Sequence, residues 1–129
     1  MYSWLIGRVI RSLYRKMLAG KPEAVAALAA RQVELVVPGS SPLAGEYRGK
    51  AEYESWLRRF TALGPTMTVH DVVASGGPWN TRVAVRLTES IGTEYRNEAI
   101  DYLRLRWGKL RYHQIYLDTE VLAVHEIAA

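Results

Sequence analysis

The sequence of 129 residues contains no cysteine, and this absence excludes several kinds of chemistry at once. A chain without thiols has no disulfide, no thiolate metal ligand and no cysteine nucleophile. Its three histidines, His70, His113 and His125, stand far apart, so there is no HExxH pair and no compact set of histidine and carboxylate ligands. We therefore predict no metal and no cofactor.

Long hydrophobic runs and nucleotide-binding motifs are also missing. The opening segment MYSWLIGRVIRSLYRKML interrupts its apolar residues with four cations, which excludes both the apolar core of a signal peptide and a membrane span of about 20 residues. No GxGxxG, GxxxxGK[S/T] or GxSxG segment occurs, so phosphate-cradling loops and a serine nucleophile elbow are absent. We expect a cytoplasmic protein with no membrane partner.

The charge is positive but not concentrated in any segment. The formal net charge is +4, yet lysines and arginines occur in ones and twos along the chain, with no basic run and no nucleic-acid-binding motif. We therefore expect no nucleic-acid partner. A hydrophobic content of 49% over this length suits one core of ordinary size, and we assign residues 1–129 to a single domain.

Helical spacing dominates the first half of the chain. Apolar residues recur every three or four positions from Trp4 until Gly20, which predicts a first helix. PEAVAALAARQ predicts a second helix over 22–32, followed by a short strand in VELVVP. The segment PGSSPLAGEYRG is expected to be a loop, and KAEYESWLRRFTAL predicts a third, amphipathic helix that ends at Gly64.

Alternation of apolar and polar residues dominates the second half. The turn signals GGPWN, IGT and WG separate four alternating segments, 66–75, 81–90, 95–106 and 109–117, which predicts an antiparallel meander. Helices first and strands later indicate an α+β fold. We expect three N-terminal helices packed on a strongly curved, mixed but mostly antiparallel sheet, forming a cone in the manner of a cystatin-like α+β barrel. The open end of such a cone is a natural pocket for a small hydrophobic molecule.

One of these strands carries a carboxylate on its apolar face. Asp101 alternates in phase with Ala99, Leu103 and Leu105 and therefore points inward. If WGK forms a three-residue turn, Leu103 lies opposite His113 and Asp101 lies opposite Ile115. Asp101 and His113 are then diagonal neighbours, about 7–8 Å apart at the backbone. Burial disfavours the charged form of a carboxyl group, so we expect Asp101 to be protonated and to donate a hydrogen bond to a ligand.

These patterns define a candidate site. In the strand before Asp101, the inward alternation of Val83, Val85 and Leu87 continues to Glu89. Two alternatives stay open: Asp101 and His113 also suit a buried structural pair, and Glu89 beside a turn also suits exposure to solvent. We expect Asp101 and His113 to be catalytic, with substrate contacts from Tyr14, Val37, Tyr53, Trp56, Phe60, Glu89, Ile115 and Leu117. Asp118 is interpreted as the N-cap of a helix in EVLAVHEI.

The order of elements resembles the nuclear transport factor 2-like superfamily, in particular its ketosteroid isomerase-like and SnoaL-like members. The segments that carry this resemblance are the VVP strand end, YRGKAEYESWL and IDYLRLRWGKLRYHQIYLDT. The resemblance implies for Asp101 the role of the protonated oxyanion-hole aspartate of the isomerases. It also shows departures: Val37 stands where the general base is expected, and Leu13 where a helix-one tyrosine is expected, with Tyr14 one residue later.

Other members of the superfamily suggest different chemistry. The arginine and two aspartates of limonene epoxide hydrolase map onto Leu87, Glu89 and Ile115, which keeps one carboxylate of that site. SnoaL-like cyclases need only an acid/base histidine or aspartate in an apolar cone, which Asp101 and His113 supply. Two functions follow. The first is a cofactor-free isomerase, cyclase or hydrolase acting on a hydrophobic carbonyl, enol or epoxide compound, and the second is a non-catalytic ligand-binding or dimerisation module.

The same resemblance implies an assembly. Tyr102, Tyr112, Gln114 and Tyr116 lie on the outward face of the last two strands, and aromatic, polar surfaces of this kind are enriched at protein interfaces. Dimers that pack sheet against sheet are what the resemblance implies. We therefore expect a homodimer through the outer face of the sheet.

Overall fold

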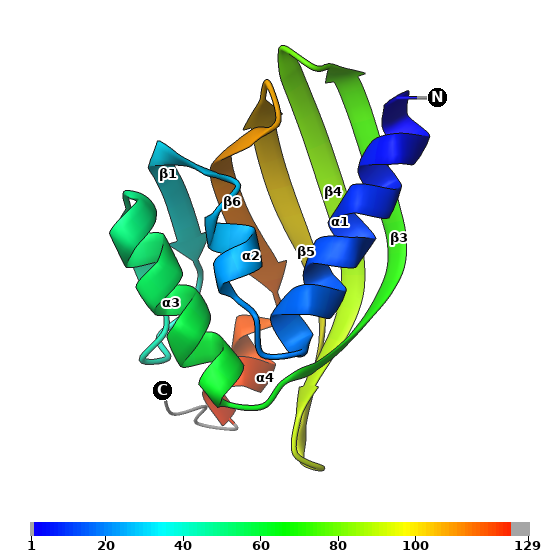
Figure 1. Cartoon of the computed structure of the whole chain (residues 1–129). Coiled ribbons are helices and arrows are strands. Elements are labelled where there is room, and N and C mark those ends of the chain that lie inside the picture. Colours follow the sequence, from blue (N-terminus) through cyan, green and yellow to red (C-terminus); the bar gives the residue numbers. More distant parts are fainter. Residues whose placement is uncertain (1, 125–129) are drawn as a thin grey trace.

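The computed structural model describes residues 2–124, in which helices cover one face of a single sheet (Figure 1). The helices are α1 (Tyr2–Leu18), α2 (Glu23–Ala26), α3 (Lys50–Ala62) and α4 (Thr119–Val124). The strands are β1 (Ala29–Val37), β2 (Gly45–Arg48), β3 (Thr66–Gly77), β4 (Asn80–Ile91), β5 (Tyr95–Arg106) and β6 (Lys109–Leu117). None of the helices within 2–124 is long and apolar enough to cross a membrane.

The sheet is mixed, with strand order β2-β1-β6-β5-β4-β3. β1 and β6 run parallel, and every other neighbouring pair is antiparallel. This arrangement confirms the predicted α+β class and the meander of the last four strands. Three helices precede the meander as predicted, and the short α4 follows it, where the sequence predicts a helix after Asp118.

The layer of helices lies against a sheet that bends around it. α1 crosses the side formed by β3, β4 and β5, while α3 lies by β1, with α2 between the two helices (Figure 1). A bulge in β3 between Val69 and Asp71 shifts its register with β4, and bulges of this kind bend a strand and increase its twist.

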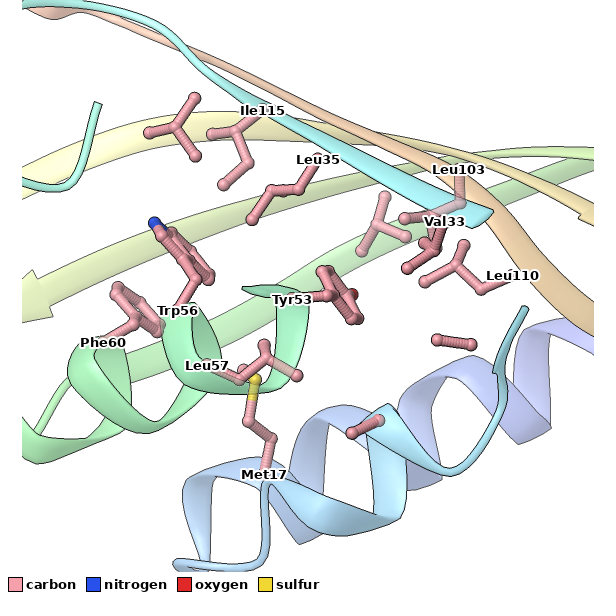
Figure 2. Packing of buried hydrophobic residues seen from close by; sticks show 14 of the residues in the cluster. Met17, Val33, Leu35, Tyr53, Trp56, Leu57, Phe60, Leu103, Leu110 and Ile115 are labelled. Carbon is pink, nitrogen blue, oxygen red and sulfur yellow. The ribbon is translucent and has the colours of Figure 1, made fainter. Parts of the chain in front are cut away.

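The core lies between the helices and the inner face of the sheet. In β5 every second residue from Tyr95 to Leu105 is buried, as expected for a strand with one covered face. On the helical side Met17 reaches from α1 toward α3, where the rings of Trp56 and Phe60 stack with their centroids 5.2 Å apart (Figure 2). A side chain on the inner face of β4, β5 or β6 therefore faces this apolar layer.

The predicted second helix is wrong over most of its length. It forms only Glu23–Ala26, and the chain is already extended from Ala29, which pairs with Leu110 of β6. The backbone N–H of Leu110 also donates to the carbonyl of Leu28 at 2.8 Å. Alanine favours helix by less than 1 kcal/mol per residue, and the partner strand decides between two conformations so close in free energy.

Two local predictions are corrected in a similar way. Residues 45–48, expected within a loop, form the edge strand β2, whose partner is the end of β1. The expected three-residue turn at WGK is a two-residue turn at Trp107 and Gly108, with Arg106 opposite Lys109. A bulge between Arg104 and Leu105 on the ladder restores the register, so Leu103 still faces His113 and Asp101 still faces Ile115.

Candidate active site

A cavity of about 100 Å³ lies between the helices and the inner face of the sheet. A volume of this size is several times what one water molecule needs, and is comparable to cavities that admit a small aromatic ring. Its wall is mostly apolar and includes all ten predicted site residues: Tyr14, Val37, Tyr53, Trp56, Phe60, Glu89, Asp101, His113, Ile115 and Leu117.

Asp101 is held by a tyrosine from the first helix. Asp101 is 4% exposed on the inner face of β5, and the Tyr14 hydroxyl donates a hydrogen bond to its Oδ2. Tyr14 rather than position 13 is thus the residue of α1 that reaches the carboxylate. Helical spacing alone places it on the right face, because Tyr14 follows the buried Ile10 by four residues and precedes the buried Met17 by three.

His113 lies beside Tyr14 and Asp101 but makes no hydrogen bond to Asp101. Its Nε2 is 3.6 Å from Asp101 Oδ2, too far for a hydrogen bond, while its Nδ1 lies 2.9 Å from the Tyr53 hydroxyl. The Tyr53 hydroxyl has no other hydrogen-bond partner within residues 2–124, so we assign it as the donor to Nδ1, which leaves the imidazole proton on Nε2. That Nε2–H is buried and has no partner among the described residues.

Burial keeps the two tyrosines in their neutral, donating form. It raises the pKa of Tyr14 and of Tyr53 well above the ordinary value, and the Asp101 charge raises both further. Ionising either hydroxyl would place a second negative charge near Asp101 in an apolar layer. Both hydroxyls therefore remain hydrogen-bond donors at any physiological pH.

Glu89 occupies a different part of the cavity. The residue is 5% exposed, so the structure places it inside rather than in solvent. Within residues 2–124 no group donates a hydrogen bond to its carboxyl oxygens, and burial, with Asp101 adding a smaller effect, raises the pKa of Glu89 to about 7. Glu89 lies four positions beyond Val85, the partner of Asp101, which separates the two backbones by about 13 Å along β4.

Aromatic and aliphatic side chains form the rest of the wall. The indole Nε1 of Trp56 donates to the carbonyl of Leu43 at 3.1 Å, which fixes the ring in its stacked position on Phe60. The sheet contributes the aliphatic side chains of Val37, Ile115 and Leu117. The cavity thus offers an apolar chamber with a few polar atoms, an arrangement typical of small-molecule sites.

Sequence reasoning missed Tyr95, which also lines the cavity. It is 3% exposed, and burial, followed by the charge of Glu89, raises its pKa to about 12. The Asn97 side chain donates to the Tyr95 hydroxyl at 3.0 Å. Extending the alternation of β5 back from Ala99 would have found both residues, since each lies two positions from the next.

The C-terminal helix closes one side of the site through Leu122, which lines the cavity. Asp118 Oδ1 accepts hydrogen bonds from the backbone N–H groups of Glu120 and Val121, which confirms its predicted role as an N-cap. The predicted end of this helix and His125 lie outside the described residues. Among residues 2–124, no group of three or more histidine and carboxylate side chains is arranged to hold a metal ion.

Comparison with known proteins identifies the family. Residues 10–113 match the SnoaL-like domain. The chain belongs to the SnoaL-like family. No curated protein matches this SnoaL-like chain.

Solved structures show the same fold. An NTF2-like protein from Burkholderia xenovorans superposes with a TM-score of 0.72 at 19% identity, over 97% of this chain and 98% of that one. SalBIII, an epoxide hydrolase/cyclase-like enzyme in pyran ring formation in the polyether salinomycin, gives 0.70 at 15% identity over 88% and 91%. A candidate ketosteroid isomerase from Kribbella flavida gives 0.66 at 21% identity over 86% and 76%. At such identities the likeness shows the fold alone.

Proposed function

We propose that this SnoaL-like domain binds a small hydrophobic carbonyl compound in its cavity and moves a proton on it without a cofactor. The main support for this proposal is the burial of Glu89 at the cavity wall. A carboxyl group that is buried at the wall of an apolar cavity and has no hydrogen-bond partner among residues 2–124 lowers the stability of the folded protein. Groups of this kind are common where a protein performs acid/base chemistry.

Glu89 is suited to the role of general base. A base works best when its pKa lies near the working pH, and the pKa of Glu89 is about 7. In the ionised form it would take a proton from the carbon next to the substrate carbonyl, forming an enolate. Returning that proton to another carbon of the same molecule completes an isomerisation. Alternatively, the enolate carbon attacks a second carbonyl of the substrate and forms a ring, and Glu89 returns the proton to the resulting alkoxide.

His113 supplies a donor for the carbonyl oxygen. Its Nε2–H is buried at the cavity wall beside Asp101 and has no partner among residues 2–124, whereas the single proton of the Tyr14 hydroxyl is already donated to Asp101. As negative charge develops on the oxygen of the enolate, such a fixed donor stabilises it more than water does. Asp101 in this mechanism accepts a hydrogen bond from Tyr14, which replaces the role of ligand donor expected for it from the sequence. The separation of Asp101 from Glu89 leaves room for a substrate that lies along β4.

Two structural relatives support chemistry of this class. SalBIII is an epoxide hydrolase/cyclase-like enzyme, and the Kribbella flavida protein is a candidate ketosteroid isomerase. Both names describe reactions of small organic molecules on the same fold. The reaction type of this chain, whether isomerisation, cyclisation or hydrolysis, follows from the substrate that fills the cavity.

One observation favours a second function, that of a non-catalytic binding module. Val37 stands at the position of the general base in ketosteroid isomerase-like relatives, and it is a buried wall residue of the cavity. In that case the cavity would hold a hydrophobic ligand without turning it over, and Glu89 would contact the ligand.

The two functions are distinguished by whether the protein catalyses exchange of a carbon-bound hydrogen of a ketone for deuterium. Deuterium uptake from D₂O at the carbon next to the carbonyl of a set of apolar cyclic ketones is followed by NMR, with phenol and toluene binding measured by calorimetry. We expect catalysed exchange that Glu89→Gln lowers about 10²–10⁴-fold, while Glu94→Gln, a matched change in the exposed β4–β5 turn, leaves it intact. Phenol should bind more tightly than toluene by about 1.5–3 kcal/mol.

Three results would contradict parts of this proposal. Exchange that Glu89→Gln does not change would remove Glu89 as the base. Ligand binding without exchange of any ketone would assign the chain to the binding modules, and equal affinity for phenol and toluene would show that no donor in the cavity meets the ligand oxygen.

A further inference from the structure

Three of the four tryptophans are exposed, and all three lie at one end of the molecule. Trp4, Trp79 and Trp107 are 63%, 61% and 67% exposed, whereas Trp56 is buried. The backbone N–H of Trp107 donates a hydrogen bond to the carbonyl of Pro78 at 2.7 Å. This bond joins the β5–β6 turn to the β3–β4 turn. A 2.6 Å hydrogen bond between the hydroxyls of Tyr2 and Thr81 joins the first turn of α1 to the same end (Figure 1). We call this end, residues 2–8, 77–82 and 104–111, the tryptophan tip.

The tryptophan tip carries cations and no acids. Its charged residues are Arg8, Arg82, Arg104, Arg106, Lys109 and Arg111, and none of them forms an ion pair with an acidic side chain of residues 2–124. Because the whole chain has a formal net charge of +4, the remainder is net acidic. Dispersed along the sequence, these cations are brought together only by the fold.

The cations are placed where they repel one another. Arg82 lies directly opposite Arg104 across β4 and β5, and Arg106 directly opposite Lys109 across β5 and β6. Like charges in directly opposed positions destabilise an antiparallel sheet. Two such pairs, with no neutralising acid among the described residues, are expected where an external anion supplies the missing negative charge.

Trp107 is an unfavourable residue type for its position in the β5–β6 turn. It is the single described residue other than glycine with a positive φ, 51°, and Gly108 follows with a φ of 78°. A two-residue hairpin turn with two positive φ values favours Asn-Gly, and a bulky residue there stores strain. The ring gains little from packing, since it is 67% exposed, so neither the turn nor the core explains a tryptophan at this position.

From the sequence alone we expect no membrane partner; from the arrangement of these residues in the folded chain we propose instead that the tryptophan tip docks on an anionic membrane surface. Exposed tryptophans insert at the level of lipid headgroups, and lysines and arginines around them bind acidic headgroups. Single-stranded nucleic acid would also meet cations and aromatic rings, but α1 adds exposed aliphatic side chains, Leu5 at 52% and Val9 at 41%. Aliphatic side chains partition into lipid and offer no surface on which a base stacks.

Vesicle co-sedimentation of the full chain tests the proposal. Vesicles of phosphatidylglycerol and phosphatidylcholine in equal amounts should pellet the protein, pure phosphatidylcholine vesicles should not, and added salt should weaken the binding. Arg106→Glu with Lys109→Glu should lower the partition coefficient at least about tenfold. Lys21→Glu with Arg96→Glu, the same charge change on exposed residues outside the tip, should lower it much less. Trp107→Asn should weaken binding while retaining the fold, because asparagine suits the turn.

Three outcomes would overturn the proposal. The protein pelleting with neither kind of vesicle is the first. Equal losses in the tip variant and in the Lys21 and Arg96 variant would show that net charge alone drives the binding. A single-stranded oligonucleotide that binds more tightly than the vesicles, with the Arg106 and Lys109 variant losing that binding, would assign the tip to nucleic acid.

Discussion

Replacing Glu89 by glutamine measures how much the ionisation of one buried carboxyl group changes the free energy of unfolding. In the folded chain the pKa of Glu89 is about 7, against an ordinary value of 4.5. Below pH 4.5 the group is protonated in both the folded and the unfolded states and its ionisation does not affect stability. Between pH 4.5 and about 7 the unfolded state loses its proton first, so the free energy of unfolding falls as the pH rises. Above about pH 7 the full penalty is present.

The size of the penalty follows from the difference between the two pKa values. At about 1.36 kcal/mol per pH unit, the interval from 4.5 to about 7 corresponds to about 3 kcal/mol. Glutamine is neutral at every pH and close to the protonated carboxyl group in shape. The difference in unfolding free energy, Glu89→Gln minus wild type, should therefore rise by about 3 kcal/mol between about pH 4 and about pH 8.

Urea denaturation at a series of pH values measures this difference, and every titrating group common to both proteins cancels from it. Glu94→Gln, in the exposed β4–β5 turn, should give a difference that does not vary with pH. A flat difference for Glu89→Gln would mean that Glu89 titrates alike in both states and is solvated. A difference that falls with pH would mean that the folded protein stabilises the ionised carboxylate. Either result would refute the reasoning that makes Glu89 a base with a raised pKa.

Three further predictions concern stability and assembly. Tyr14→Phe removes the hydroxyl that donates to the buried Asp101 and should lower the free energy of unfolding by about 1–3 kcal/mol in the same denaturation assay; an unchanged value would mean that Asp101 finds another donor. Trp107→Asn relieves the positive φ and should raise the free energy of unfolding by about 0.5–1 kcal/mol; a loss would show that the ring stabilises the monomer. We expect a homodimer through the outer face of β5 and β6, where the exposed Ile100 and Tyr116 lie opposite one another, and Ile100→Arg should give monomers in sedimentation equilibrium; a monomeric wild type at micromolar concentration would contradict it.

Much of the candidate site was predictable from alternation alone. Successive side chains of a strand point to opposite faces, so a single apolar neighbour such as Leu103 or Leu87 assigns the face of Asp101 or Glu89. The register between β5 and β6 was predicted from a different turn and survives because the bulge compensates for the shorter loop. The contact of Tyr14 with Asp101 does not follow from local pattern, because this hydrogen bond joins residues 87 positions apart and depends on how α1 lies across the sheet.

The amino-acid sequence by itself determined the order of elements, the inward faces of the long strands and the apolar character of the interior, since these follow from local periodicity and the turn residues between the strands. Tertiary structure alone decided the rest. It turned the alanine-rich segment before Val33 into strand, because pairing with β6 outweighs a weak helical preference. Within residues 2–124 it left His113 Nε2 without a hydrogen-bond partner, and it placed Glu89 and Asp101 on the wall of one cavity. It also collected six dispersed cations and three exposed tryptophans at one end, because strand pairing brings together residues that no local pattern connects.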